Sequence, residues 1–572
     1  MFLANKSPNV PIRSVLDRGA QGTCTPQRFC LNCRMENLEI IILLLTLTTF
    51  LAVISAKTRF PFPILLILVG VAAGTIPWVP TIILKPDIVF LIFLPPLLYY
   101  SAWGLPWPDF KANLRPITLA GVGLVFFTTC LVAWAAHEYV PGLGWAEAFV
   151  LGAIISPPDA VAAAAATKGL GLHRRIVTIL EGESLINDAS GLVAYKYAIA
   201  AVITGAFSLW QASLQFVWVA TAGVLVGLVL GYMMAWIHKN LVHGPQEEVT
   251  LSFLTAYFAY LIAENLHVSG VLAVVACGLY MSFRSSEIYT FQARLQGRAV
   301  WDTVNFILNS IVFILIGLQL KTILANLSSQ YALGDLVIYG LIVSGATIFA
   351  RFLWVYPAAY LPRLSKRTRT REYFQHSNVI IFCWAGMRGV VSMAAAFALP
   401  LTMNNGQPFP NRDLILFITF AVVFVTLVVQ GLTLPWLIKL LKLQPHSILA
   451  EEAKIRLQVA YSSVAHIEEN LSFGVISEQV LSQIKTKYEI RINHLQARQA
   501  PVSQVEDPTA KPLEDAAAIF EQFMDIQVEL IRVERQFLRD LQLAGSVESE
   551  IIRDLERELD LEEARLTGHE RQ

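Results

Sequence analysis

Residues 180–189 read LEGESLINDA and place three carboxylates in a segment that is apolar on both sides. In an α-helix Glu183 stacks on Asn187 and Ser184 on Asp188, because each pair is four residues apart. Carboxylate, hydroxyl and amide oxygens are ligands for small, hard cations rather than soft metals. Hydrogen bonds between helices are the plain structural alternative, but a charged side chain in mid-membrane costs about 2.5–3.5 kcal/mol on insertion scales. The segment therefore predicts a cation site inside a membrane.

This segment belongs to one of thirteen apolar stretches between Leu38 and Leu441. Hydrophobic residues make up 55% of the 572 residues and charged residues 15%. Each stretch has about 17–25 residues, enough to cross the hydrocarbon core as a helix. The tenth, centred near residue 311, follows a predicted loop that carries Arg294 and Arg298. We expect an all-α polytopic membrane protein with about 13 transmembrane helices.

The basic residues of the connecting loops alternate between the two sides. With the N-terminus outside, the inner loops carry sixteen Lys and Arg residues and the outer loops carry three. Positive residues collect on the cytoplasmic side of membrane proteins. The sequence therefore predicts a multi-pass protein of the plasma membrane, with its N-terminus outside and its C-terminal tail in the cytoplasm.

The net charge of zero is a cancellation between two parts of the chain. Residues 1–445 contain 29 basic and 19 acidic side chains, whereas residues 446–572 contain 14 basic and 24 acidic ones. We expect residues 1–34 to be a disordered extension or to precede the true start, 35–445 to form a transmembrane transport domain, and 446–572 a helical regulatory tail. Apolar residues mostly three to four apart predict a helix between Glu514 and Leu543. A neutral chain has no basic excess for binding nucleic acid.

Two of the predicted spans contain features that break a helix. The fifth carries Pro157, Pro158 and Asp159, and two prolines remove two helical N–H donors. The twelfth carries Gly386-Met387-Arg388-Gly389. Broken helices with charged residues form ion sites in secondary transporters. The two breaks are seven spans apart, so equivalent helices run in opposite directions, which indicates inverted repeats of roughly spans 1–6 and 8–13.

Basic side chains inside the membrane are expected to compensate the acids. Arg351 lies in the middle of the eleventh span and Arg388 at the break in the twelfth. Each arginine is a candidate counter-ion for Asp159, Glu183 or Asp188, and a purely structural role is favoured for Arg351. Lys196 follows Asp188 by two turns and is expected to reach the interface or to pair locally.

These motifs resemble the monovalent cation:proton antiporter family, which includes NhaP-type bacterial antiporters and animal sodium/proton exchangers. The resemblance covers about residues 36–445. It is carried by motifs in the family's order, which are Ser156-Pro157-Pro158-Asp159, Gly182-Glu183-Ser184-Leu185-Ile186-Asn187-Asp188, Arg351, Gly386-Met387-Arg388-Gly389 and Val429-Gln430-Gly431-Leu432-Thr433. Many members have Thr in the place of Pro158, and an acid in the place of Tyr100.

The resemblance implies a role for each residue of the site. Asp188 would bind the cation and the proton in turn, with Asn187 beside it. Glu183 and Ser184 would shape the site, so that Asp188, Glu183 and Ser184 are the expected ligands of transported Na⁺. Arg351 would pair with Glu183, and Asp159, Pro158 and Arg388 would lie at the breaks. The family also implies a homodimer formed through the early and middle spans, surrounded by membrane lipid.

One carboxylate can exchange two ions if the cation and the proton compete for it. Deprotonated Asp188 would bind Na⁺, Li⁺ or K⁺, and protonated Asp188 would return without metal. Because Asn187 and not a second acid lies beside it, exchange is expected to be one for one and electroneutral. Alternating access at this single site requires no covalent chemistry and no cofactor, and the sequence has no P-loop. We therefore expect a transporter and not an enzyme.

Other classes of protein share some of these features. An intramembrane aspartyl protease also uses two membrane acids, for which Asp159 and Asp188 are candidates, but its Gly-x-Gly-Asp motif is missing and Glu183, Arg351 and Arg388 would have no role. A K⁺/H⁺ antiporter and a cation channel would use the same oxygen ligands. A transporter of an organic substrate is disfavoured, since no aromatic-lined pocket is evident in the sequence.

Overall fold

The structure is a computed structural model of the 572-residue chain. It describes residues 42–55, 57, 61–76, 86–159, 163, 174–205, 209–242, 244–328, 330–360, 376–403, 406–441, 448–470, 482–489, 492, 516–545, 547 and 549–567. The predicted N-terminal extension, residues 1–34, lies outside them. The described residues are helical, apart from connecting segments and an isolated β-bridge between Thr402 and Pro408. The prediction of an all-α chain is confirmed.

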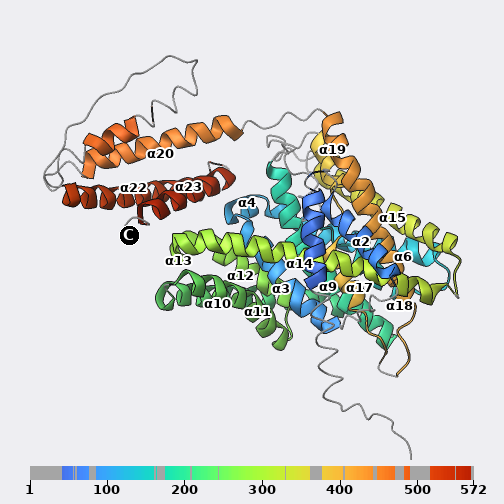
Figure 1. Ribbon diagram of the computed structural model, residues 1–572. Helices are drawn as coiled ribbons and strands as arrows, with labels where there is room; N and C mark the ends of the chain where they lie inside the picture. The colour runs from blue at the N-terminus through green and yellow to red at the C-terminus, as the bar shows by residue number, and fades with distance from the viewer. Residues whose placement is uncertain are drawn as a thin grey trace, which may run out of the picture.

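The helices fall into a large bundle and a smaller group that follows it in sequence (Figure 1). The large bundle contains α2 (Phe62–Thr75), α3 (Pro86–Gly104), α4 (Trp107–Ala112), α5 (Leu114–Thr118), the π-helix η1 (Leu119–Leu124), α6 (Val125–Tyr139), α7 (Trp145–Ile155), α9 (Arg174–Thr204), α10 (Leu209–Leu241), α11 (Pro245–Asn265), α12 (Gly270–Phe283), α13 (Ser285–Ile288), α14 (Phe291–Leu327), α15 (Leu333–Tyr360), α16 (His376–Trp384), α17 (Val390–Phe397), α18 (Arg412–Val425), the π-helix η3 (Thr426–Gln430) and α19 (Gly431–Leu440). The tail contains α20 (Ile448–Asn470), α22 (Ala516–Ala544) and α23 (Ser549–Thr567).

Apolar surface identifies the large bundle as a membrane domain. Among the described residues, five helical segments are long and apolar enough to cross a membrane, namely Leu114–Tyr139, Ser213–Leu241, Phe291–Leu327, Leu333–Tyr360 and Arg412–Leu440. Five shorter apolar helices accompany them. Large apolar side chains also point outward from α10, including Trp218 and Val229. An outward apolar surface of this kind needs lipid or another apolar surface around it.

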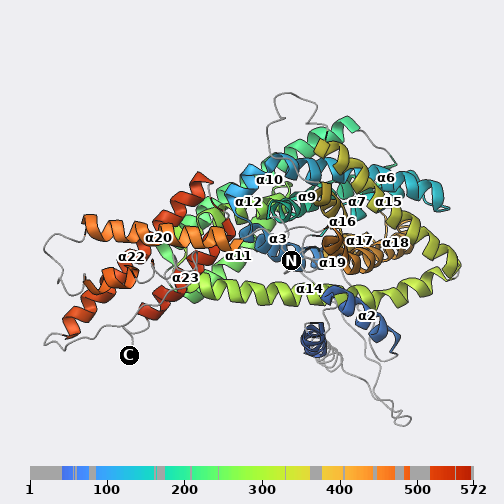
Figure 2. The same ribbon diagram turned by 90° about the horizontal axis from the view of Figure 1, so that it is seen from above.

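Helix α14 is the longest element and runs the length of the bundle (Figure 2). Its 37 residues span about 55 Å at the rise of an α-helix, more than the hydrocarbon core requires. It begins at Phe291, so the prediction of a loop around Arg294 and Arg298 is wrong: both arginines lie on the overhanging first turns. Glycines fix its packing on α2, because a Cβ on Gly70 or on Gly317 would lie 2.4 Å from a backbone carbonyl oxygen of the other helix.

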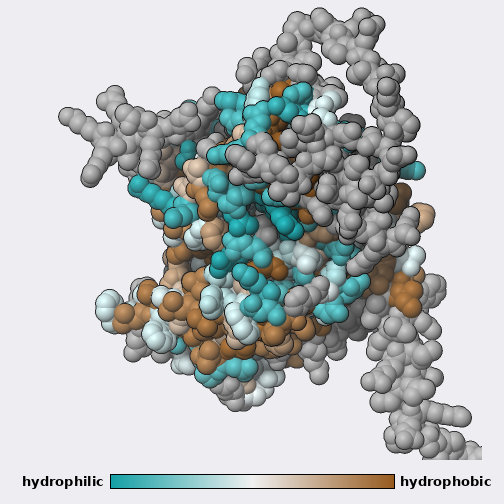
Figure 3. All heavy atoms as spheres, turned by 90° about the vertical axis from the view of Figure 1, so that its left-hand side faces the viewer, coloured by the Kyte–Doolittle hydropathy of each residue, from teal (hydrophilic) through white to brown (hydrophobic). Residues whose placement is uncertain are grey.

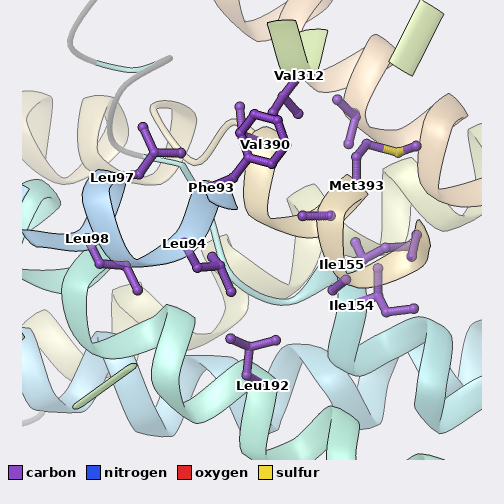
Figure 4. Close-up of a cluster of buried hydrophobic side chains, with 14 of the residues drawn as sticks. Phe93, Leu94, Leu97, Leu98, Ile154, Ile155, Leu192, Val312, Val390 and Met393 are labelled. Carbon is purple, nitrogen blue, oxygen red and sulfur yellow. The ribbon is translucent and has the colours of Figure 1, made fainter. Parts of the chain in front are cut away.

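A hydrophobic core joins the helices that carry the charged motifs. Figure 4 shows Phe93 and Leu94 of α3, Ile155 of α7, Leu192 of α9 and Val390 of α17 in one cluster. Ile155 directly precedes the first break and Val390 directly follows the second. Because lipid tails are as apolar as these side chains, close van der Waals packing holds such a cluster together inside a membrane. The core therefore holds the irregular segments in register.

Both predicted helix breaks are present. Helix α7 ends at Ile155, and the described residues Ser156–Asp159 are not helical. Helix α16 ends at Trp384 and α17 begins at Val390, with non-helical backbone between them. The prolines explain the first break, since neither can donate a backbone hydrogen bond. Such backbone is tolerated inside a membrane only where other protein groups or water satisfy it.

The tail forms its own helical group, and helix α22 confirms the helix predicted around Glu514–Leu543. Ile531 and Leu538 of α22, Ile455 and Val459 of α20 and Ile552 of α23 are buried together. Figure 3 looks at the molecule from the side of the tail, and hydrophilic residues gather in the middle of this face above a more hydrophobic lower part. The amphipathic pattern of the sequence is thus used for packing between tail helices.

The tail also contacts the membrane domain through charged side chains. Asp560 of α23 pairs with Arg294 at the start of α14 and with Arg535 of α22, and its Arg294 Nε–Oδ2 distance is 3.0 Å. Arg539 of α22 pairs with Glu287 of α13 at 2.9 Å. Arg553 donates a hydrogen bond to the carbonyl oxygen of Gly104, the last residue of α3. The tail is therefore docked on the ends of α3, α13 and α14.

Candidate functional site

A buried ion pair joins α9 to α15. Arg351 Nη1 donates to Glu183 Oε1 at 2.6 Å and Nη2 donates to Oε2 at 2.8 Å, so the pair is bidentate. The two side chains are 2% and 1% exposed. Arg351 Nε donates to the carbonyl oxygen of Phe382 at 3.1 Å, and its guanidinium lies 4.7 Å from the centroid of the Phe382 ring. Every face of this arginine is thus engaged by a carboxylate, a carbonyl or a ring.

The first glycine of the Gly386-Met387-Arg388-Gly389 motif makes room for this pair. A Cβ on Gly386 would lie 2.5 Å from Arg351 Cδ. Only a residue without a side chain allows the arginine to cross the break on its way to Glu183. The pairing of Arg351 with Glu183 and the break after α16 therefore depend on each other.

The two broken segments touch. Asp159 N donates to the carbonyl oxygen of Met387 at 2.7 Å, and Val390 N donates to Asp159 Oδ2 at 3.3 Å. Ser392 Oγ approaches the carbonyl oxygen of Pro157 at 3.5 Å. A Cβ on Gly389 would lie 1.7 Å from Asp159 Oδ2, so the second glycine of the motif permits this contact. The Asp159 carboxylate lies at the N-terminus of α17, where the helix dipole favours a negative charge.

Asn187 and Asp188 face these segments from α9. Asn187 Nδ2 donates to the carbonyl oxygen of Pro158 at 3.1 Å, so Pro158 contributes a backbone oxygen to this contact. Asp188 is 5% exposed and close enough to Asp159 for their charges to interact. Ser184 lies one turn before Asp188 and is half-buried. Among the described residues, no ion pair joins Asp188 to a basic side chain.

Arg388 occupies the second break and is buried. Its backbone N–H donates to Thr426 Oγ1 at 3.1 Å. Its side-chain atoms Nε and Nη1 have no hydrogen-bond partner among the described residues. The structure thus brings together the predicted site residues Asp159, Pro158, Glu183, Ser184, Asn187, Asp188, Arg351 and Arg388, contributed by α9, α15 and the two breaks. Arg351 is paired here, whereas Nε and Nη1 of Arg388 have no partner in the part of the chain that the structure describes.

Three acidic residues outside this set were not predicted as partners. The hydroxyl of Tyr100 donates to Asp302 of α14, and Glu181 is close enough to interact electrostatically with Tyr100. Tyr100 thus holds a carboxylate of α14 beside α3. Lys196 pairs with Glu264 at 3.1 Å and not with Asp188. The sequence did not predict the contact of Asp302 with Tyr100, because Arg294 and Arg298 before it indicated a loop rather than the start of a long helix.

Oxygen donors dominate the site. Among the residues that the structure describes, no group of three or more His, Cys, Asp or Glu side chains is arranged as a metal centre. Both Glu183 oxygens are bonded to Arg351, so in this conformation Glu183 is a neutralised anchor. Asp188, the carbonyl of Pro158 and the amide of Asn187 are hard oxygen ligands near the breaks, suited to a monovalent cation as cargo.

The transmembrane domain of sodium/hydrogen exchangers matches residues 41–440 of the chain. The chain belongs to the sodium/hydrogen exchanger family. This family contains antiporters, in agreement with the predicted class of transporter. The resemblance drawn from the sequence motifs is confirmed, and the exchanger is a multi-pass membrane protein of this family.

The matches to curated relatives cover different shares of the chain. It is 30% identical over 541 residues to the "uncharacterized Na(+)/H(+) exchanger" of Mycobacterium bovis, covering 92% of this chain and 96% of the relative. It is 34% identical over 414 residues to the sodium, potassium, lithium and rubidium/H⁺ antiporter of Bacillus pumilus, covering 70% and 61%. Its fold is similar to the sodium proton antiporter MjNhaP1 of Methanocaldococcus jannaschii, with a TM-score of 0.56, 20% identity and coverage of 69% and 99%.

Replacing Gly389 by alanine should destabilise the exchanger. The new methyl group would meet the Asp159 carboxylate at the crossing of the breaks. We expect a loss of about 1–3 kcal/mol, the usual range for overpacking, measured as thermal unfolding of the purified protein in detergent. Gly345→Ala in α15 is the matched control, because nothing lies within 4 Å of its Cβ position. Equal stability of the two variants would contradict the close approach.

Arg351→Ala should lower the thermal stability of the protein far more than the loss of an exposed ion pair does. It leaves Glu183 buried without its partner, which costs about 3–5 kcal/mol. Lys196→Ala is the comparison, because its pair with Glu264 is 63% and 34% exposed and such pairs contribute about 1 kcal/mol or less. The double variant Arg351→Met with Glu183→Leu should regain most of the lost thermal stability. Similar unfolding temperatures for Arg351→Ala and Lys196→Ala would refute the assignment.

Proposed function

We propose that the chain exchanges Na⁺, Li⁺ or K⁺ for H⁺ across the membrane by alternating access at Asp188. The observation that carries this proposal is the contrast between the acids of the site. Glu183 is held in a bidentate pair by Arg351, and Asp159 accepts a hydrogen bond at the start of α17. Asp188 has no basic partner among the described residues, so its charge is balanced by whichever cation it binds.

The same contrast supports an electroneutral exchange of one cation for one proton. Asn187 cannot titrate, and its side-chain amide donates a hydrogen bond to the carbonyl oxygen of Pro158. Glu183 stays neutralised by Arg351. Only one carboxylate then changes its occupant during the cycle, so either Na⁺ or H⁺ balances a single negative charge. Ligation of Na⁺ by Asp188, Ser184 and backbone or amide oxygens, with Glu183 behind them, agrees with the chemistry of hard cations.

Alternating access in this proposal rests on about thirteen spans in two inverted repeats. The two breaks that cross at Asp159 and Met387 belong to equivalent spans of the two repeats. Secondary transporters place such discontinuous helices around a midplane site and rock one bundle against the other. With the N-terminus outside, the tail and the ends of α3 and α14 face the cytoplasm. Tyr100, Asp302 and Glu181 would then lie on the cytoplasmic access path to Asp188.

Which monovalent cations the site accepts is a separate question within this function. The Bacillus pumilus relative is named for sodium, potassium, lithium and rubidium, which favours a site that accepts several monovalent cations and makes K⁺/H⁺ exchange the second candidate. The expected homodimer would place one copy's early and middle spans against the other's. Helix α10, with Trp218 and Val229 outward, has the apolar surface that such a contact or lipid requires.

Asp188→Asn should abolish exchange. Asparagine keeps the size of the side chain but neither binds a proton nor balances a cation. Purified protein in liposomes with an imposed ΔpH should collapse the gradient on addition of Na⁺, and the variant should behave like protein-free liposomes. Asp335→Asn, at an exposed acid in the first turn of α15, is the control and should transport normally. Unimpaired exchange by Asp188→Asn would refute the site.

We further propose that the docked tail regulates exchange through α3 and α14. Burial raises the pKa of Glu556 in α23, opposed by Arg294, while Asp560 adds to the rise and Arg535 and Arg539 oppose it. In this proposal docking supplies the burial of Glu556, so the docked tail binds its proton more tightly than a released tail does. Docking is favoured below the ordinary pKa of a glutamate and weakens as the pH rises through the raised value. A docked tail restrains the end of α3, which follows Tyr100, and the start of α14, which precedes Asp302.

Arg294→Glu should release the tail, raise the exchange rate at the acidic end of the pH profile and flatten that profile. Truncation after Gln444 should have the same effect, and Arg294→Glu should change nothing further in the truncated chain. Lys485→Ala is the control, because its pair with Glu468 lies within the tail. A pH profile of exchange in liposomes checks this. Wild-type profiles for both altered chains, or additive effects, would contradict regulation through this contact.

A further inference from the structure

The segment between α16 and α17 packs along the helix formed by η3 and α19. Trp384 Nε1 donates to Thr433 Oγ1 at 2.9 Å, and Arg388 N donates to Thr426 Oγ1 at 3.1 Å. A Cβ on Gly431 would lie 3.8 Å from the sulfur of Met387. Both ends of the unwound segment are therefore in contact with residues 426–433.

Gln430 lies between the two threonines on the same helix face. It follows Thr426 by four residues and precedes Thr433 by three, and residues with these spacings are neighbours on a helix surface. Its side chain is 1% exposed, and its Oε1 has no hydrogen-bond partner among the described residues. A buried amide oxygen on the helix that contacts the unwound segment therefore lacks a donor among the described residues.

The unwound segment holds the complementary group. Arg388 is also 1% exposed, and its Nε and Nη1 have no acceptor among the described residues. An unpaired buried donor and an unpaired buried acceptor each destabilise the conformation in which they occur. An apolar side chain of similar size would avoid that penalty at position 430. Both groups thus lack partners on two elements that are in contact.

We propose that Gln430 is a positioning residue of the transport cycle, whose side-chain carbonyl accepts a hydrogen bond from Arg388 in a second conformation of the carrier. In that conformation the polar groups left unpaired here satisfy each other. The bond stabilises the second conformation relative to this one, so Gln430 sets the balance between the two orientations of the site. This inference rests on the proposed alternating-access exchange.

The π-helical form of η3 provides a way to make this change. A π-helical turn holds one residue more than an α-helical turn, and such segments occur frequently at functional sites. Conversion of Thr426–Gln430 to α-helical hydrogen bonding rotates Gln430 relative to Thr426. Thr426 keeps the backbone of Arg388 in place through its hydroxyl, so the side chains of Arg388 and Gln430 can approach without separation of the two elements.

Gln430→Met tests the inference because methionine keeps the volume but lacks the acceptor. Loss of one hydrogen bond changes an equilibrium by about three- to tenfold. The apparent Na⁺ affinity depends on the fraction of carriers that face the side of measurement. In right-side-out and inverted liposome populations, the variant should shift the apparent Na⁺ KM by about threefold or more in opposite directions on the two sides. Gln430→Glu, which keeps an acceptor and adds charge attraction to Arg388, should reverse both shifts.

Thr128→Val in α6 is the matched control. Like Gln430→Met, it removes a buried polar group that has no partner among the described residues. It should leave both KM values unchanged. A parallel loss of affinity on both sides in Gln430→Met, or KM values equal to wild type in both variants, overturns the proposal. Absence of Na⁺-dependent exchange in the wild type would instead overturn the proposed function, so the two failures are distinguishable.

Discussion

Two breaks in membrane helices have to satisfy their exposed backbone groups, and in this exchanger they do so partly through each other. Asp159 supplies an N–H to the carbonyl of Met387 and a carboxylate to the N–H of Val390. Lipid offers no hydrogen bonds, so neither segment could stay unwound alone. The glycines of the second break follow from the same constraint, because Gly389 lets Asp159 approach and Gly386 lets Arg351 pass. The shape of the site is therefore set by backbone satisfaction before any ion is considered.

Once the breaks are fixed, the acids of the site take different roles. A buried carboxylate that is paired in a bidentate fashion is an immobile charge, and Glu183 is such a group. A carboxylate that accepts a backbone N–H at a helix start is part of the scaffold, and Asp159 is such a group. Asp188 is left as the one acid whose counter-ion the described protein does not provide. In the proposed exchange, the partners of the neighbouring acids thus leave Asp188 as the single exchanging carboxylate.

The sequence was informative where a residue differed from the apolar helix around it, either by its charge or by breaking the helix. Prolines inside the fifth span and charges such as Asp188 and Arg351 stand out against an apolar background, so the breaks and the charged core of the site were predictable. Contacts between neutral residues were not, because they depend on how helices rotate and cross. The approach of Gly389 to Asp159 joins positions 230 residues apart, and the Val429-Gln430-Gly431-Leu432-Thr433 motif does not reveal that Gln430 is buried. Asp302 was hidden for another reason, since α14 extends beyond the length that a membrane requires.

The docking of the tail cannot be explained by the opposite net charges of the two parts. An acidic tail attracted to basic loops would contribute only acids to the contact, yet Arg539 and Arg553 of the tail face Glu287 and the carbonyl of Gly104. Asp560 is bound by one arginine from each part, so removal of either leaves it a partner. The Arg539–Glu287 pair is about one-third exposed and contributes about 1 kcal/mol or less, whereas the Arg294–Asp560 pair is largely buried. A contact that depends on a few charged pairs can be broken by reversing one charge, which is the property that the proposed regulatory contact on α3 and α14 needs.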